Sequence, residues 1–383
     1  MRIATPMWTP DAGPTNAVAL EVLLNGPISR SEIARRLDLS AGSLTRLSTP
    51  LLETGLLVEA GERTDGRAGR PSRLLDIVPG SRCFLGFKLT GEGILGAATD
   101  LRAGVLATGS VRLGSRDPDA VVDSIAVLVD RLAADVPPVT AIGIGVGALV
   151  GAHGRVRSAP FLGWRDVELG ALLEARTGLP TVVENDVTAF TEYENWFGAA
   201  RGIDRFAVVT LGAGVGYGLV VGGNVVVGPD SGIGLVGHWP LDPFGPVCPA
   251  GHRGCAASVL TTSGVESSVS AALGRTVRYD EALDLAEAGE PAARRIVDDA
   301  GRGLGRLLAA IANLTVPELV VLGGEGVRLA AVAADAVREG LAHDRDPRTT
   351  ELPLATTAGD DIEWCRGAAV LAIQTYVLGR PAR

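Results

Sequence analysis

Two acidic side chains and an amide follow one another at the end of an apolar stretch. Residues 181–183 have the β-branched character of a buried strand, and Glu184, Asn185 and Asp186 come directly after them. In open α/β sheets, ligands bind at the carboxyl ends of the strands. An aspartate there accepts a proton from a hydroxyl, and an asparagine donates to and accepts from hydroxyls. These three side chains are therefore candidate ligand-binding residues, with the alternative that Glu184 only orients the strand end.

Two glycine-rich stretches are similar to one another. Residues 84–98 and 206–220 each read as an apolar strand, a turn that contains glycine, and a second apolar strand. Glycine lets the backbone approach a phosphate closely, and N–H groups of the turn supply donors, although ordinary tight β-turns would give the same pattern. Because each stretch opens about half of residues 83–383, the repeat predicts a duplicated lobe with a cleft between the copies. A further glycine turn, residues 322–326, would face a nucleotide.

The first eighty residues predict a winged helix-turn-helix. Helices are expected over residues 15–24, about 30–37 and 41–54, followed by strands at 56–59 and 72–77. Ser29 and Ser40 are expected to be N-caps, and Glu32 is expected to reach back and complete a capping box.

A winged helix presents the N-terminal part of its third helix to base edges, and its wing to phosphates. The candidate DNA-binding residues are Ser43, Thr45 and Arg46 on the helix and Arg63, Arg67 and Arg70 in the wing. The alternative is a small helical interaction domain with a solvated, arginine-rich loop.

Composition and charge agree with this division. The chain has 383 residues, 46% hydrophobic and 21% charged, which indicates a globular protein of two or three domains rather than a disordered one. Residues 1–80 carry nine arginines and nine acidic residues, so the whole net charge of −9 lies in the remainder. Four irregularly spaced cysteines exclude a disulfide framework. We expect a cytoplasmic protein, since no secretory signal or membrane span is recognisable.

Together these features resemble the ROK family of repressors, open reading frames and sugar kinases, over essentially the whole chain. The resemblance rests on Gly69–Pro71 of the wing, Gly145–Gly147, Gly163-Trp164, Glu184–Asp186, Leu211–Gly216, Gly237-His238, the Cys248–Cys255 loop and Gly323-Gly324. It implies an α/β fold with an actin-like/hexokinase-like two-lobed body, whose lobes span about 81–200 and 201–383, behind a winged helix-turn-helix at 1–80. It also implies a homodimer or homotetramer.

The chain departs from the kinase members of that family. Their phosphate loop reads Asp-x-Gly-Gly-Thr, whereas residues 88–92 here begin with Lys88. Lysine does not coordinate the Mg²⁺ that phosphoryl transfer needs, so ATP turnover is expected to be lost and Asp186 is a vestigial base position. Leu235 and Ala257 replace two glutamates that bind sugar in the family.

The resemblance also implies a structural zinc ion, bound in the family by one histidine and three cysteines. The matching positions are His238, Cys248, Ala250 and Cys255, so one ligand is missing. His252 could supply the fourth bond. The alternative is a metal-free loop with two free thiols.

The leading hypothesis is a DNA-binding transcriptional regulator of the repressor type. A sugar or sugar phosphate would bind its degenerate kinase cleft through Asn185, Asp186 and His238 and control binding to a double-stranded DNA operator. The alternatives are a constitutive DNA-binding oligomer with a silent cleft and an ATP-dependent sugar kinase with a DNA-binding head. The expected partners are operator DNA, the sugar effector and further copies of the chain, with no membrane.

Overall fold

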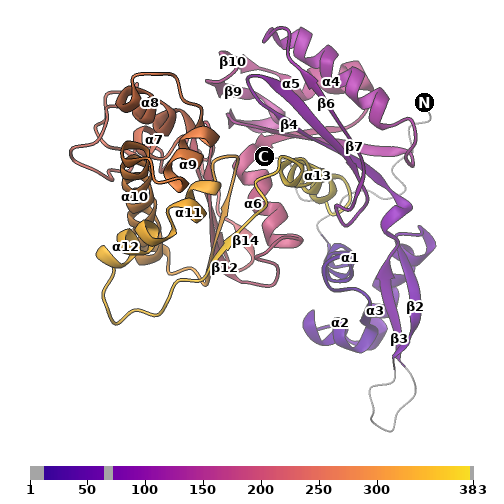
Figure 1. The fold of residues 1–383 in the computed structure, drawn as a ribbon. Coiled ribbons are helices and arrows are strands. Elements are labelled where there is room, and N and C mark those ends of the chain that lie inside the picture. Colours follow the sequence, from indigo (N-terminus) through magenta and orange to yellow (C-terminus); the bar gives the residue numbers. More distant parts are fainter. Residues whose placement is uncertain (1–12, 64–71, 380–383) are drawn as a thin grey trace. The chain divides into compact units, whose positions relative to one another are not determined.

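The structure is a computed structural model and describes residues 13–63 and 72–379 (Figure 1). Its contacts divide the chain into two units. The first contains residues 1–197 and 362–383, and the second contains residues 198–361. The sequence placed the second lobe at about 201–383, but the C-terminal helix returns to the first unit because its apolar side chains are buried in that unit's core.

The N-terminal part of the first unit has three helices and a three-stranded sheet of order β1-β3-β2. The elements are α1 (Pro14–Asn25), β1 (Ile28–Ser29), α2 (Arg30–Arg36), α3 (Ala41–Glu53), β2 (Leu57–Arg63) and β3 (Ser72–Ile77). The predicted helices and the predicted hairpin are present. The short strand β1, which pairs with β3, was not predicted.

Both predicted N-caps of this head, residues 13–77, are confirmed. Ser29 Oγ accepts from Glu32 N at 3.2 Å, and Ser40 Oγ accepts from Ser43 N at 3.1 Å. The expected reciprocal half of the capping box is wrong, because the Glu32 carboxylate accepts instead from Arg35 and Arg36, which lie one turn further along the helix.

The head is joined to the rest of the first unit by polar contacts and by apolar packing. Asn16 Nδ2 donates to the carbonyl oxygen of Leu378 at 2.8 Å, and Arg102 Nη2 donates to Gly26 O at 3.2 Å and to Asp76 Oδ1. Apolar residues of the head share one buried cluster with residues of the C-terminal helix. The head and this helix are therefore parts of one packed core.

The remainder of the first unit is built on a five-stranded sheet of order β11-β7-β4-β5-β6. Its strands are β4 (Cys83–Leu89), β5 (Gly93–Thr99), β6 (Val105–Arg112), β7 (Val139–Val146) and β11 (Thr181–Asn185). A small second sheet contains β8 (Leu149–Val150), β9 (Val156–Ala159) and β10 (Trp164–Val167). The helices are α4 (Pro118–Leu132), α5 (Leu169–Thr177), α6 (Asp186–Trp196) and α13 (Ile362–Tyr376), with 3₁₀ turns at Pro79–Ser81 and Ala152–Gly154.

The second unit has a five-stranded sheet of order β14-β13-β12-β15-β16. Its strands are β12 (Arg205–Leu211), β13 (Val215–Val221), β14 (Asn224–Val225), β15 (Leu319–Gly323) and β16 (Leu354–Thr356). Its helices are α7 (Ala256–Val259), α8 (Thr262–Leu273), α9 (Tyr279–Glu287), α10 (Pro291–Thr315), α11 (Arg328–Val332) and α12 (Ala334–His343).

The two five-stranded sheets have the same topology. In each, the first strand of the glycine-rich hairpin pairs antiparallel with the second and parallel with a later strand, as β4 does with β5 and β7 and β12 does with β13 and β15. The repeat between residues 84–98 and 206–220 therefore marks two copies of one α/β architecture. Among the helices that the structure describes, none is both long and apolar enough to cross a membrane.

Candidate functional site

Helix α3 presents a polar, exposed surface at its N-terminal end. Thr45 and Arg46 are exposed and Ser43 is half-buried, while Leu44 and Ser48 face the core. Within the described residues, Arg46 makes no ion pair, whereas Arg30 of α2 is paired with Glu59 at 3.1 Å. Arg46 is thus the basic side chain of this helix that is free to reach a base edge.

The predicted wing is described only in part. Strand β2 ends at Arg63, which pairs with Ser72 of β3 through the backbone. The side chain of Arg63, and the whole of Arg67 and Arg70, lie outside the described residues. Their contacts with DNA stay predictions.

The predicted ligand residues of the first unit meet where β11 ends and α6 begins. Asn185 is buried, and its Oδ1 accepts from Thr188 N at 3.1 Å, which caps α6. Its Nδ2 donates to Ala148 O and to Asp186 Oδ1, both at 3.2 Å. Glu184 Oε1 accepts a hydrogen bond from the backbone N–H of Asn185 at 2.8 Å, and both roles considered for Glu184 stay predictions.

Asp186, like Glu184, is a half-buried carboxylate of this group. Its Oδ1 accepts from Val187 N at 2.9 Å and from Asn185. Its Oδ2 lies on the side of Gly147, where a β-carbon would be 3.5 Å away. A carboxylate in the first turn of a helix is stabilised by the helix dipole. One oxygen is therefore fixed by the helix, and the other faces the Gly145–Gly147 turn.

Side chains of the first unit pack against the first glycine hairpin, β4–β5. Lys88 is buried, and its ammonium lies 4.2 Å from the centre of the Trp364 ring, which is stacked on Phe190. The backbone of Gly91 accepts from Arg116 Nε at 2.9 Å. Trp364 was missed by the sequence analysis, since nothing in the sequence places α13 against residue 88.

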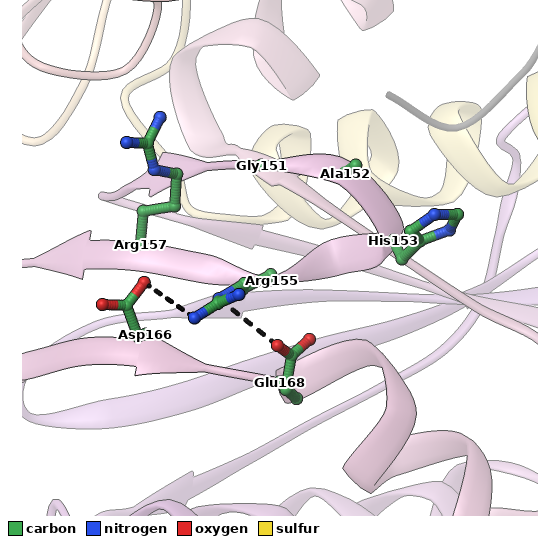
Figure 2. A pocket seen from close by; sticks show the side chains of 7 residues that line it. All are labelled: Gly151, Ala152, His153, Arg155, Arg157, Asp166 and Glu168. Carbon is green, nitrogen blue, oxygen red and sulfur yellow. Dashed lines mark ion pairs between the residues drawn. The ribbon is translucent and has the colours of Figure 1, made fainter.

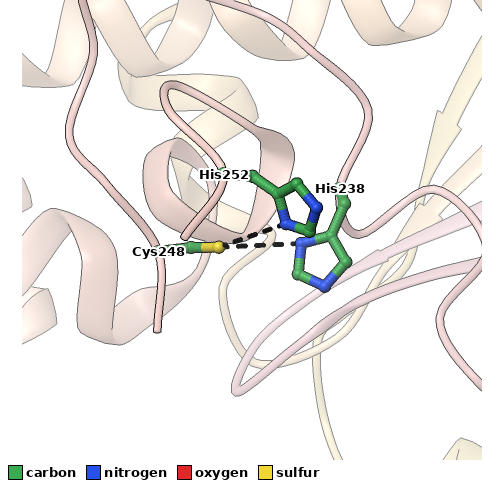
Figure 3. A group of neighbouring side chains, drawn as sticks. All are labelled: His238, Cys248 and His252. Atoms are coloured by element: carbon green, nitrogen blue, oxygen red, sulfur yellow. Dashed lines mark hydrogen bonds between the residues drawn. The ribbon is translucent and has the colours of Figure 1, made fainter. Parts of the chain in front are cut away.

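The predicted metal ligands of the second unit lie on one loop and its base (Figure 3). The ligand atoms of His238, Cys248 and His252 all lie within 4.8 Å of one another. A tight turn produces this arrangement: Gly251 N donates to Cys248 O at 2.8 Å, Cys248 N donates to His252 O at 2.9 Å, and Gly251 has φ of +88°. The turn folds His252 back onto Cys248.

The spacing of these donors fits a tetrahedral zinc ion. Cys248 Sγ lies 3.8 Å from His238 Nδ1 and 3.6 Å from His252 Nδ1, and Cys255 Sγ lies 3.7 Å from His238 Nδ1. Tetrahedral bonds of ordinary Zn–S and Zn–N length place sulfur and nitrogen about 3.6 Å apart. Burial raises the pKa of the Cys248 thiol, but hydrogen bonds with His252 and backbone groups outweigh it and lower the pKa to about 7. The thiolate that a metal needs is thereby favoured.

The positions of the two lost sugar-binding glutamates flank this loop. Leu235 is exposed, and Ala257 is half-buried with its N–H donating to Gly237 O at 2.6 Å. Neither side chain offers a polar atom. The second unit thus contributes one polar side chain, His238, from the predicted ligand set.

A cavity of about 480 Å³ lies elsewhere in the first unit, beside the β8–β10 sheet (Figure 2). Arg155 lines it and pairs with Asp166 at 3.2 Å and with Glu168 at 3.3 Å. All three side chains are about half exposed, so these ion pairs are weak. None of the predicted site residues lines this cavity.

Comparisons with known proteins agree over most of the chain. A model of the ROK family matches residues 85–375. The DNA-binding transcriptional repressor Mlc of Escherichia coli is 28% identical over 348 residues, which cover 85% of this chain and 85% of that protein.

Two solved structures match this chain over different lengths. A ROK family transcriptional regulator, a homolog of the E. coli Mlc protein, has a TM-score of 0.83 at 25% identity, covering 95% of this chain and 96% of that one. A ROK family glucokinase from Streptomyces griseus in complex with glucose and AMPPNP has a TM-score of 0.66 at 26% identity, covering 76% of this chain and 99% of that one. The regulator therefore matches nearly the whole chain, and the kinase matches a smaller part.

Proposed function

This chain belongs to the ROK family, and on that premise we propose that it is a sequence-specific DNA-binding transcriptional repressor whose body responds to a sugar or sugar phosphate. The observation that carries the proposal is the likeness of almost the entire chain to a transcriptional regulator, together with a winged helix that leaves Arg46 unpaired among the described residues. Two copies of the chain would place two α3 helices in successive major grooves of an operator.

The effector would be recognised by Asp186 and His238. Asn185, the other predicted ligand residue, would position Asp186, because its amide oxygen caps α6 and its amide nitrogen donates to the Asp186 carboxylate. Oδ2 of Asp186 would accept a hydrogen bond from a sugar hydroxyl. Leu235 supplies an apolar surface where related proteins have a glutamate, so the effector would present fewer hydroxyls, or an apolar or acyl group, on that side.

A structural zinc ion would be held by His238, Cys248, His252 and Cys255. His252 would replace the cysteine that the family has at position 250. When bound, zinc would fix His238 through Nδ1 and leave Nε2 for the effector.

The body would not phosphorylate its sugar. Lys88 stands where a kinase needs a carboxylate for Mg²⁺, and it is buried against Trp364 instead of facing a nucleotide. The replacement of both glutamates, by Leu235 and Ala257, removes contacts that hold the sugar in kinases. The relatives named as repressors agree with a role that is not enzymatic.

The proposal is tested by fluorescence anisotropy on DNA from upstream of the gene, at fixed salt. The DNA-bound protein is titrated with hexoses, pentoses, N-acetylhexosamines and their 6-phosphates. Release by one class of compound supports the proposal. Tight specific binding that no compound affects would indicate a constitutive DNA-binding oligomer, and sugar-dependent ADP formation would indicate a kinase.

Asp186→Ala is expected to leave operator affinity unchanged and to weaken the response to the releasing sugar by roughly 10- to 150-fold, because a hydrogen bond to a charged acceptor contributes about 1.5–3 kcal/mol. Asp119→Ala is the matched control, since Asp119 is an exposed carboxylate in the first turn of α4. The sugar concentration at half-release measures both. An unchanged midpoint for Asp186→Ala would place the effector elsewhere.

Arg46→Ala is expected to reduce discrimination between operator and unrelated DNA by about 5- to 150-fold, which corresponds to 1–3 kcal/mol for one base contact. Arg67→Ala should instead weaken binding to both DNAs alike and reduce the salt slope by about one. Anisotropy at several salt concentrations distinguishes these outcomes. If the two variants behave alike, Arg46 contacts phosphate and not a base.

A further inference from the structure

The second glycine hairpin and the turn after β15 lie side by side in the second unit. Strands β12 and β15 are parallel neighbours with Thr210 opposite Gly323, so both chains leave the sheet at the same edge. Gly326 N donates to Leu211 O at 2.8 Å. A β-carbon on Gly324, whose φ is +89°, would lie 2.3 Å from the same oxygen. The turn after β15 can pack against the hairpin only because Gly324 has no side chain.

This packing brings an acidic side chain onto the glycine turn. Glu325 Oε1 accepts from the backbone N–H of Ala213 at 2.8 Å. A β-carbon on Gly212 would lie 2.3 and 2.5 Å from the two carboxylate oxygens. The carboxylate therefore rests directly against the backbone of the Gly212–Gly214 turn, in space that a β-carbon at position 212 would occupy.

Backbone N–H groups of a glycine-rich turn can form a binding site for anions such as phosphate. Here one such donor is already engaged by an anion that belongs to the chain. A polyphosphate that approached this turn would meet the negative charge of Glu325 and would find the Ala213 N–H already hydrogen-bonded.

We propose that Glu325 acts as an internal substitute for a nucleotide phosphate and excludes nucleotides from the second unit. It satisfies the turn and holds it in shape without a ligand. The regulator then responds to its sugar regardless of the ATP concentration. This extends the proposed function by stating what the same body does not sense, and it adds a barrier to kinase activity on a different unit from Lys88.

The test measures anion binding by the full chain in the absence of DNA. Parent protein, Glu325→Ala and the control Glu318→Ala are titrated calorimetrically with inorganic tripolyphosphate and with ATP. Glu318 is an exposed glutamate of the same unit that lies just before β15. Glu325→Ala is expected to bind tripolyphosphate at least about tenfold more tightly than the parent and the control, since it loses a like charge and frees a donor.

Equal affinities in all three proteins, or submillimolar binding by the parent, would overturn the proposal. Should alanine disturb the turn, as judged by a lowered unfolding temperature, Glu325→Gly removes the carboxylate without introducing a side chain. In a separate arm, operator binding by the parent should not change with millimolar ATP. Failure to bind any operator would overturn the proposed function alone, because the titration with tripolyphosphate contains no DNA.

Discussion

Purified protein is expected to contain about one equivalent of zinc, and His252→Ala is expected to lower its zinc affinity by at least about a hundredfold. Loss of a residue that only supports a zinc ligand already costs about 10- to 100-fold, so loss of a ligand should cost more. The reason to single out His252 is geometric. Its Nδ1 lies 3.6 Å from Cys248 Sγ, which is the separation of two ligands on one tetrahedral zinc ion.

Chelator competition and metal analysis measure this effect. His343→Ala is the control, because His343 is an exposed histidine of the same unit that pairs with Asp344 and lies outside the His238, Cys248 and His252 cluster. A second substitution sharpens the test. Ala250→Cys, added to His252→Ala, is expected to restore tight binding, since it returns the ligand that the family has at that position. Full zinc content in His252→Ala alone would show that the ion needs only His238, Cys248 and Cys255.

Features of the fold that depend on neighbouring residues could be predicted from the sequence. The caps Ser29 and Ser40 act on N–H groups three residues away, so their pattern is readable in the chain. The duplicated hairpins could be predicted because both copies keep the same apolar and glycine pattern. Strand β1 could not be predicted, since a two-residue strand exists only through its pairing with β3.

Site residues followed the same rule. The strand end at Asn185 was predicted because it lies within a few consecutive residues, whereas the metal ligands Cys248 and His252 were expected from the resemblance to the ROK family. The contact between Glu325 and Ala213 joins positions 112 residues apart, and that between Lys88 and Trp364 joins the two separate segments of the first unit. The sequence contained one sign of the former, a glutamate inside the glycine turn at 323–326. It contained none of the latter.

Gly143→Ala is expected to destabilise the first unit strongly. Gly143 of β7 and Gly86 of β4 are opposite one another in the sheet, and α13 lies directly on both. A β-carbon at Gly143 would be 1.8 Å from the carbonyl oxygen of Ala368, and one at Gly86 would be 1.9 Å from that of Cys365. Because these contacts are with backbone, the helix itself must move. We expect the free energy of unfolding to fall by about 3 kcal/mol or more and the melting temperature to fall by roughly 6–12 °C.

The same substitution should also weaken DNA binding, because α13 packs against the head. Two residues beyond its last turn, Leu378 accepts the hydrogen bond from the buried Asn16 of α1. Displacement of α13 by Gly143→Ala should therefore weaken operator binding even where the protein remains folded. Gly80→Ala is the control, since a β-carbon there meets nothing within 4 Å. Thermal unfolding followed by circular dichroism, with anisotropy well below the transition, measures both effects. A lowered melting temperature with unchanged operator affinity would show that displacement of α13 does not disturb the DNA-binding head.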